Sequence, residues 1–225
     1  MNISSDQLAR MIDHTLLRPE ATRDEVEKVC EEGRCFNFAT VCVNPAWVSL
    51  ASKLLKGTGV KVNAVIGFPF GATMIDVKVF ETKRVLSNGA EEIDMVMNFG
   101  AFRSGDLELV KEELRSVVDI AREHNVVSKI IIETCYLTQM EKIKACQLVM
   151  DCGANFVKTS TGFGTSGATV EDVKLLRQVV DHKIGIKASG GIRTYDDAVK
   201  MIHAGASRIG SSAGVNILRA SSSNR

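Results

Sequence analysis

The sequence predicts a single α/β domain, a closed parallel (β/α)8 barrel of the TIM type with a short extra N-terminal helix. Short apolar runs, most of them β-branched, alternate with longer amphipathic stretches along the chain, which is typical of repeated βα units. Eight such runs in 225 residues give about 28 residues per unit, which suits a small barrel. No G-x-G-x-x-G motif follows the first run, and this disfavours the alternative, an open doubly wound sheet.

The runs expected to form strands are bounded mostly by Gly, Pro, Asn or Ser, residues that end strands. In order they are MIDHTLL (11–17), FATVCVN (38–44), VKVNAVIGF (60–68), EEIDMVMN (91–98), VSKIIIET (127–134), NFVKTS (155–160), IGIKASG (184–190) and SRIGSS (207–212).

Helical patterns fill the segments between these runs. Thr22 and Glu25 form a capping-box signature at the start of the first long helix, and apolar residues recur at helical spacing from about 107 to 124. The other helices are expected at about 45–55, 73–88, 138–152, 169–180 and 194–204. Residues 1–219 are therefore interpreted as the barrel domain, and residues 220–225 as a polar C-terminal tail.

The formal net charge of +1 gives no reason to expect a nucleic-acid or membrane-surface partner. The N-terminus lacks the pattern of a signal peptide, and no apolar run approaches the ~20 residues that span a bilayer. Six cysteines without a C-x-x-C pair are interpreted as reduced thiols, so we expect a cytoplasmic protein. Four scattered histidines give no metal-site spacing, which disfavours a metal enzyme. We expect no cofactor.

Two lysines stand where buried strands should end, and in such a barrel the active site lies at the carboxyl ends of the strands. Lys158 ends the run FVK and Lys187 ends IGIK, on consecutive predicted strands. Neighbouring strands lie about 4.8 Å apart, so two inward ammonium groups at one height repel each other and one loses its proton more easily. A neutral lysine amine attacks carbonyl carbons to form a Schiff base. The plainer alternative is that each lysine pairs with a different carboxylate, Asp94 or Glu133.

Asp94 is the third candidate of the predicted site. In EEIDMVMN it shares a strand face with Val96 and Asn98, whereas Ile93, Met95 and Met97 take the other face. A buried aspartate that faces two lysines can serve as their counterion or relay protons through water, and periodicity leaves both roles open.

Three small-residue loops follow the last three predicted strands: TSTGFGTSG (159–167), ASGGIRT (188–194) and GSSAG (210–214). Glycine lets backbone N–H groups converge on an anion, and phosphate sites in these barrels often use the loops after the seventh and eighth strands. Together the loops favour a phosphate pocket, although turn geometry alone explains glycine in any one of them.

Weaker candidates stand near the ends of the first two strands. Asp13 and Thr15 are expected to hydrogen-bond a sugar hydroxyl or to cap a turn, and Cys42 to face the pocket or to pack as a buried thiol. Lys129 and Glu133 share a strand face, so we expect them to pair inside the barrel.

The motifs taken together resemble the deoxyribose-phosphate aldolase family over essentially the whole chain. They are IDHTLL (12–17), EIDMVMN (92–98), FVKTSTGF (156–163), IKASGGIRT (186–194) and RIGSS (208–212). The resemblance implies a (β/α)8 barrel that reversibly cleaves 2-deoxy-D-ribose 5-phosphate to D-glyceraldehyde 3-phosphate and acetaldehyde, through a lysine Schiff base and without a metal. It also implies a homo-oligomer, a dimer or a tetramer.

By motif position, the resemblance makes Lys158 the Schiff-base nucleophile, Lys187 the second lysine that tunes it, and Asp94 the proton relay. Its phosphate site falls on Gly162, Gly190, Gly191 and Ser212, and Cys42 stands where the family often has a cysteine beside the pocket. Two features depart from many members: Ala213 replaces a second serine, and the ending SSSNR lacks a tyrosine. A non-catalytic phosphosugar-binding barrel and another phosphosugar lyase or isomerase remain the alternative functions.

Overall fold

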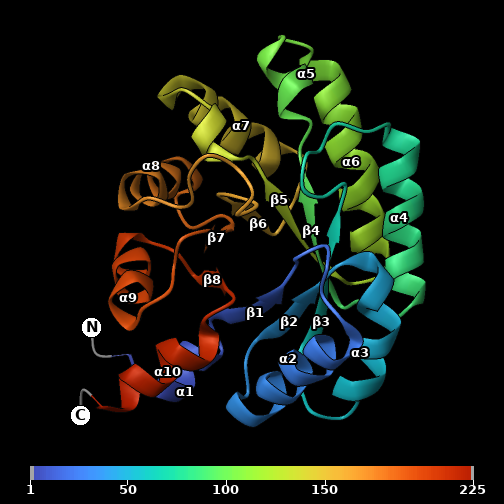
Figure 1. Cartoon of the computed structure of the whole chain (residues 1–225). Coiled ribbons are helices and arrows are strands. Elements are labelled where there is room, and N and C mark those ends of the chain that lie inside the picture. The colour runs from blue at the N-terminus through green and yellow to red at the C-terminus, as the bar shows by residue number, and fades with distance from the viewer. Residues whose placement is uncertain (1–2, 224–225) are drawn as a thin grey trace.

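The structure is a computed structural model of the chain and describes residues 3–223. Its centre is a closed barrel of eight parallel strands in the order β1 to β8, as the sequence predicts (Figure 1). The strands are β1 (Ile12–Leu16), β2 (Thr40–Val43), β3 (Lys61–Ile66), β4 (Glu92–Val96), β5 (Val127–Ile131), β6 (Phe156–Lys158), β7 (Gly185–Ser189) and β8 (Arg208–Ser211). Each lies inside the run that predicts it.

Helices surround the barrel, and the short N-terminal helix α1 precedes the first strand (Figure 1). The described helices are α1 (Ser5–Ala9), α2 (Arg23–Phe36), α3 (Val48–Leu55), α4 (Ile75–Ser87), α5 (Phe99–Arg103), α6 (Leu107–Glu123), α7 (Gln139–Asp151), α8 (Val170–Val180), α9 (Tyr195–Ala204) and α10 (Gly214–Ser223), with 3-10 turns η1 (Pro45–Trp47) and η2 (Thr134–Tyr136). None of the helices within residues 3–223 is both long enough and apolar enough to cross a membrane.

Local sequence signals fix the helix ends. Thr22 accepts a hydrogen bond from the Glu25 amide while the Glu25 side chain accepts one from the Thr22 amide, so the predicted capping box is present. Gly205 follows α9 with φ = 117°, a left-handed conformation that favours glycine. These ends set where each helix returns to the barrel.

The two faces of each strand meet different surroundings. On β4, Ile93 and Met95 belong to the apolar core, whereas Glu92 and Asp94 are buried on the alternate face. Asp94 pairs with Lys158 of β6 and Lys187 of β7, strands that are not its neighbours in the sheet, which places this face in the interior of the barrel. The interior is therefore charged, although small barrels are usually filled with branched aliphatic side chains.

The C-terminal segment differs from the predicted polar tail. Helix α10 includes residues 220–223, and residues 224–225 lie outside the described range. Ser221 is buried, donates a hydrogen bond to the Leu218 carbonyl and lies 2.9 Å from the Ser5 hydroxyl of α1. A serine hydroxyl can donate to a carbonyl of its own helix, so polar Ser221 can be buried where α10 packs against α1.

Candidate active site

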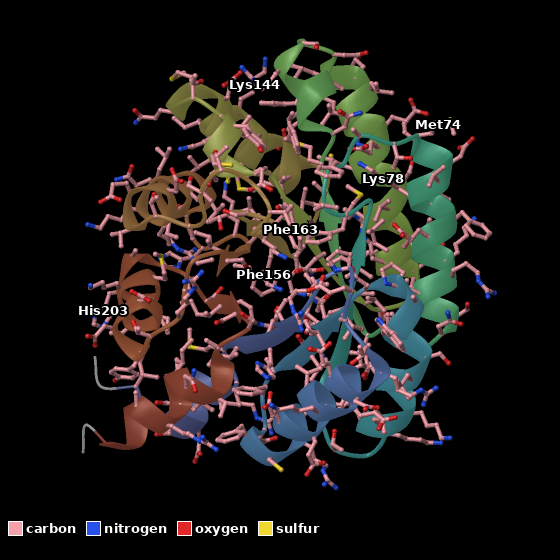
Figure 2. The ribbon with its side chains drawn as sticks, in the orientation of Figure 1. Met74, Lys78, Lys144, Phe156, Phe163 and His203 are labelled. Atoms are coloured by element: carbon pink, nitrogen blue, oxygen red, sulfur yellow. The ribbon has the colours of Figure 1, made fainter. Side chains whose placement is uncertain are left out.

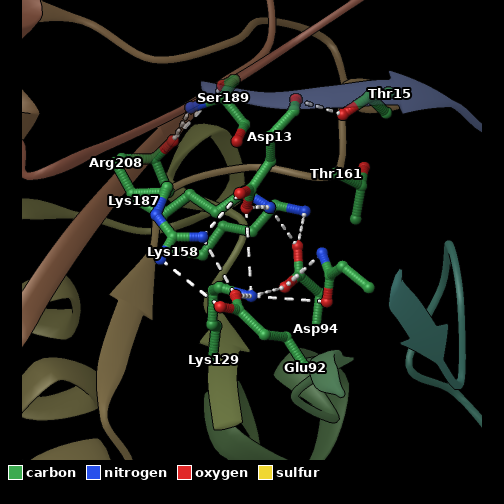
Figure 3. Close-up of polar contacts among 12 residues, drawn as sticks. Asp13, Thr15, Glu92, Asp94, Lys129, Lys158, Thr161, Lys187, Ser189 and Arg208 are labelled. Atoms are coloured by element: carbon green, nitrogen blue, oxygen red, sulfur yellow. Dashed lines mark hydrogen bonds and ion pairs between the residues drawn. The ribbon is translucent and has the colours of Figure 1, made fainter. Parts of the chain in front are cut away.

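Lys158, Lys187 and Asp94 meet inside the barrel (Figure 3). The Lys158 Nζ lies 2.7 Å from the Asp94 Oδ2, and the Lys187 Nζ lies 2.6 Å from the same oxygen. Lys158 and Lys187 are also partners in the register of β6 and β7, as expected for two inward lysines at one height. The two lysines therefore share the Asp94 carboxylate, instead of one pairing with Asp94 and the other with Glu133.

The two ammonium groups have opposite electrostatic environments. Burial lowers the pKa of Lys158, and the charge of Lys187 lowers it further, against an opposing effect from Asp94. Burial also acts to lower the pKa of Lys187, but Asp13 and Asp94 more than offset it, so that pKa is raised. The pKa of Lys158 is therefore lowered and that of Lys187 is raised, and burial is the largest cause of the lowering at Lys158.

Asp94 is held as a carboxylate. Burial acts to raise its pKa, but Lys129, Lys158 and Lys187 lower it well below its usual value. Its other oxygen, Oδ1, accepts hydrogen bonds from Lys129 at 2.9 Å and from the Asn63 amide at 3.0 Å. The side chain is thus fixed from both sides and oriented towards the two active-site lysines.

Asp13 lies in this charged network and does not line the cavity described below. Its carboxylate pairs with Lys187, and its Oδ1 accepts a hydrogen bond from Arg208 at 2.6 Å. The side chain is completely buried. The expected contact with a sugar hydroxyl therefore finds no support in this geometry, because Asp13 is occupied by two cations.

A cavity of about 320 Å3 opens at the carboxyl ends of β1 and β6 to β8, beside Lys158. Its lining includes all four glycines and serines expected to bind phosphate and one weaker candidate: Gly162, Gly190, Gly191, Ser212 and Thr15. Thr15 donates its hydroxyl to the Asp13 carbonyl at 2.9 Å, so its hydroxyl already has one partner.

The glycines of this rim are needed by the backbone. Gly162 and Gly190 have φ values of 88° and 86°, in the left-handed region. A side chain at Gly167 would place its Cβ 2.1 Å from the Gly190 carbonyl oxygen, so the loops after β6 and β7 pack backbone against backbone. Exposed Ser212 stands just before α10, whose N-terminal amides favour an anion. The rim is therefore suited to a phosphate group.

Cys42 is a packed thiol. It is fully buried in a small apolar cluster with Leu17, Val65 and Phe68, and it is not among the residues that line the cavity. Burial raises the pKa of its thiol to about 11. Of the two roles expected from sequence, buried packing fits this placement.

The structure adds residues that the sequence analysis did not select. Arg18, Phe163 and Arg193 line the cavity. Arg193 lies in the motif IKASGGIRT, so this motif could have identified it as a residue of the site. The expected ion pair of Lys129 with Glu133 is wrong, because Lys129 pairs with Asp94 and Glu92.

Glu133 instead holds the loop that follows β6. Its carboxylate accepts hydrogen bonds from the Thr161 amide, at 3.1 Å, and from the Thr161 hydroxyl. Strand periodicity does not predict the direction of the Glu133 side chain, because β5 ends at Ile131 and Glu133 adopts φ = 53°. Within residues 3–223, no three His, Cys, Asp or Glu side chains are grouped so that they can hold a metal ion.

Comparisons with known proteins show the family of the chain. A sequence model described as DeoC/LacD family aldolase matches residues 7–223. A deoxyribose-phosphate aldolase of Carboxydothermus hydrogenoformans is 56% identical over 219 residues, 96% of each chain, and one of Streptococcus gordonii is 57% identical over 213 residues, 95% of this chain and 96% of its own. The solved tetrameric deoxyribose phosphate aldolase of Aeropyrum pernix superposes with a TM-score of 0.92 at 34% identity and covers 99% of this chain and 94% of its own. The chain belongs to the DeoC/LacD family of aldolases.

Proposed function

We propose that the protein is a class I aldolase that reversibly cleaves 2-deoxy-D-ribose 5-phosphate to D-glyceraldehyde 3-phosphate and acetaldehyde. The observation that carries this proposal is the sharing of the Asp94 Oδ2 by Lys158 and Lys187 beside the cavity. A buried amine with a lowered pKa beside a cavity with a glycine-rich rim suits a carbonyl substrate that carries a phosphate. Relatives at 56% and 57% identity bear the name of this activity.

The substrate is oriented by its phosphate. We assign the phosphate to the backbone amides and hydroxyl around Gly162, Gly190, Gly191 and Ser212, at the rim of the cavity. The exposed guanidinium of Arg193 lies on the same rim and complements the anion. The open-chain sugar then extends inwards, and its C1 aldehyde reaches Lys158.

Cleavage proceeds through a Schiff base. The neutral Lys158 amine attacks C1, water leaves, and the resulting iminium withdraws electrons from the C2–C3 bond. Asp94, an ionised acceptor, takes the proton of the C3 hydroxyl through water, while charged Lys187 stabilises the developing negative charge. The C2–C3 bond breaks and C3 leaves as the aldehyde of glyceraldehyde 3-phosphate. The enamine that remains takes a proton at C2, and hydrolysis of the iminium releases acetaldehyde and restores the amine.

Reductive trapping tests the assignment. Incubation with 2-deoxyribose 5-phosphate and borohydride should leave a stable adduct on Lys158, located by peptide mass spectrometry. Lys158→Ala should abolish both the adduct and turnover, whereas Lys56→Ala, at an exposed lysine outside the cavity, should keep both. An adduct on a different lysine, or normal turnover by Lys158→Ala, would reject the proposal.

The same experiment separates the alternative functions. A non-catalytic phosphosugar-binding barrel predicts binding of the sugar phosphate without an adduct. Another phosphosugar lyase or isomerase predicts that ribose 5-phosphate is turned over at least as well as the 2-deoxy sugar. We expect rejection of ribose 5-phosphate, because an added 2-hydroxyl must give up its hydrogen bonds to water on entering a site that acts on the 2-deoxy sugar.

We also propose that the protein works as a homo-oligomer in the cytoplasm. Large apolar side chains are exposed along α4 and the loop before it: Phe70, Met74, Val77 and Phe80. Figure 2 shows Met74 at the outer side of α4, whereas Lys78 on the same helix faces inwards. The Aeropyrum pernix relative is described as tetrameric. Size-exclusion chromatography with light scattering should give a multimer, which Phe80→Glu should weaken; a monomeric wild-type protein would refute the oligomer.

A further inference from the structure

The barrel interior holds one connected group of charged side chains, here called the interior cluster, which is drawn in Figure 3. Lys129 joins Asp94, at 2.9 Å, to Glu92, at 2.7 Å. Arg208 joins Glu92, at 2.9 Å, to Asp13. The members are Asp13, Glu92, Asp94, Lys129, Lys158, Lys187 and Arg208, and the most exposed of these side chains, Arg208, is 14% accessible.

The interior cluster carries a net charge when every member is ionised. It then holds three carboxylates against four cations, which leaves one positive charge buried in the barrel. An unpaired charge in a buried site is expensive, because protein provides far less solvation than water does. Loss of a single proton from one of the four cationic side chains makes the interior cluster neutral.

Geometry selects Lys158 as the base that loses the proton. Within the described residues it pairs with one carboxylate, Asp94, and it shares the bonded oxygen with Lys187. Lys187 has Asp13 as a second partner, and Lys129 has Glu92. The guanidinium of Arg208 does not deprotonate in proteins. The pKa directions agree, since burial lowers the pKa of Lys158 while carboxylates overcome burial and raise those of Lys129 and Lys187.

The other polar and ionisable groups around Lys158 do not change the net charge of the interior cluster. The Cys42 thiol of β2 is kept protonated because burial raises its pKa to about 11. Glu133, after β5, is engaged by Thr161 and makes no ion pair with the described members of the cluster. Arg18 and Arg193 line the mouth of the cavity and are exposed, so water screens them.

We propose that the charge balance of the interior cluster holds Lys158 as a neutral amine, and that Glu92, Lys129 and Arg208 are positioning residues that set this balance from below the cavity. None of these three residues lines the cavity, so they act on the reaction through Lys158 and Asp94. The inference rests on the proposed role of Lys158 as the nucleophile. It adds that residues remote from substrate control when that nucleophile is available.

The test is the pH dependence of imine formation. Acetaldehyde is used with cyanoborohydride, and the rate of adduct formation on Lys158 is followed by mass spectrometry from about pH 5 to pH 9, with the midpoint of the acid limb reporting the amine. Arg208→Met removes a cation, so the remaining charges balance with Lys158 protonated, and the midpoint should rise by about one pH unit. Glu92→Gln removes an anion, and the midpoint should fall by about as much.

Both variants break hydrogen bonds of the same network, so simple damage to the site predicts similar effects in both. Midpoint shifts of opposite sign in the two variants therefore indicate an effect of charge. The double variant Glu92→Gln/Arg208→Met restores the original imbalance, so its midpoint should return towards that of the wild type. Lys61→Met is the matched control: Lys61 lies 4.0 Å from Glu92, but its side chain is half exposed and screened, so little shift is expected. Lys129→Met replaces Arg208→Met if the latter does not fold.

Shifts of the two single variants in the same direction, or an unmoved midpoint in Glu92→Gln, would overturn the inference. If wild-type protein forms the adduct on Lys158 and the midpoints do not move, the proposed function stands and the inference fails. Absence of the adduct in wild-type protein overturns both.

Discussion

Gly210 on β8 leaves room for the second lysine of the active site. It is the register partner of Ser189 on β7. A methyl group at this position would lie 2.3 Å from the Ser189 Oγ and 3.0 Å from the Cε of Lys187. The φ angle of Gly210 is outside the left-handed region, so alanine fits the backbone and the crowding alone is tested.

The size of the effect follows from these two distances. Ordinary van der Waals contact begins near 3.4 Å, so the Ser189 Oγ must move by about 1 Å, and the Lys187 chain by a few tenths of an ångström. Overpacking of this kind costs about 1–3 kcal/mol, and in a domain of this size each kcal/mol lowers Tm by about 2–4 °C. Because Lys187 holds Asp94 directly, we expect Gly210→Ala to lower kcat by about tenfold.

A double variant tests whether crowding against the Ser189 hydroxyl causes these losses. The Ser189 hydroxyl is buried without a hydrogen-bond partner in the described structure, so Ser189→Ala alone should leave Tm and kcat close to wild type. Combined with Gly210→Ala, it removes the closest contact and should recover most of both losses. Coupled turnover assays and thermal unfolding measure the cycle. A Gly210→Ala protein with normal Tm and kcat, or a double variant no better than the single one, would refute this account.

Three further changes probe other parts of the molecule. Lys78→Met leaves the buried carboxylate of Glu113 without its cation, and urea unfolding should show a loss of about 3–5 kcal/mol, partly recovered by adding Glu113→Gln; a loss below about 1 kcal/mol would contradict this. Burial lowers the pKa of His14 from 6.5 despite its bond to Glu32, so the unfolded chain binds a proton first as pH falls below 6.5, and the free energy of unfolding decreases. His14→Gln should flatten this decrease between about pH 6.5 and 5, and equal slopes would argue against it. Gly190→Ala forces a side chain onto φ = 86° and should raise KM for 2-deoxyribose 5-phosphate about tenfold or more, with little change for unphosphorylated 2-deoxyribose; equal losses on both would count against a phosphate rim.

Much of the architecture was predictable because its signals are local. A run such as FVK or IGIK is short, apolar and followed by small residues, and each forms the strand that its pattern predicts. The same runs placed Lys158 and Lys187 on neighbouring strands, although Lys158 ends β6 whereas Lys187 is the central residue of β7. The polar tail was predicted from composition alone, which does not show that α10 continues through residues 220–223 or that Ser221 lies beside Ser5 of α1, at the other end of the chain.

The partners of the charged side chains were less predictable. Sequence placed Lys129 and Glu133 on one strand face and predicted that they pair, yet they turn to Asp94 and Thr161. Asp13 likewise forms ion pairs with Lys187 of β7 and Arg208 of β8. Such choices depend on which side chains face one another across a closed barrel, and periodicity along one strand does not contain that information.

By itself, the sequence determined the βα repeat, the neighbouring strands that carry Lys158 and Lys187, and the glycine loops, because each depends on residues close together in the chain. The tertiary structure decided that both lysines share Asp94, and that burial is the larger cause of the lowered pKa of Lys158. It also joined Glu92 and Arg208 to the site. Closure of the barrel brings these groups within bonding distance and removes them from water, and electrostatic energies depend on both.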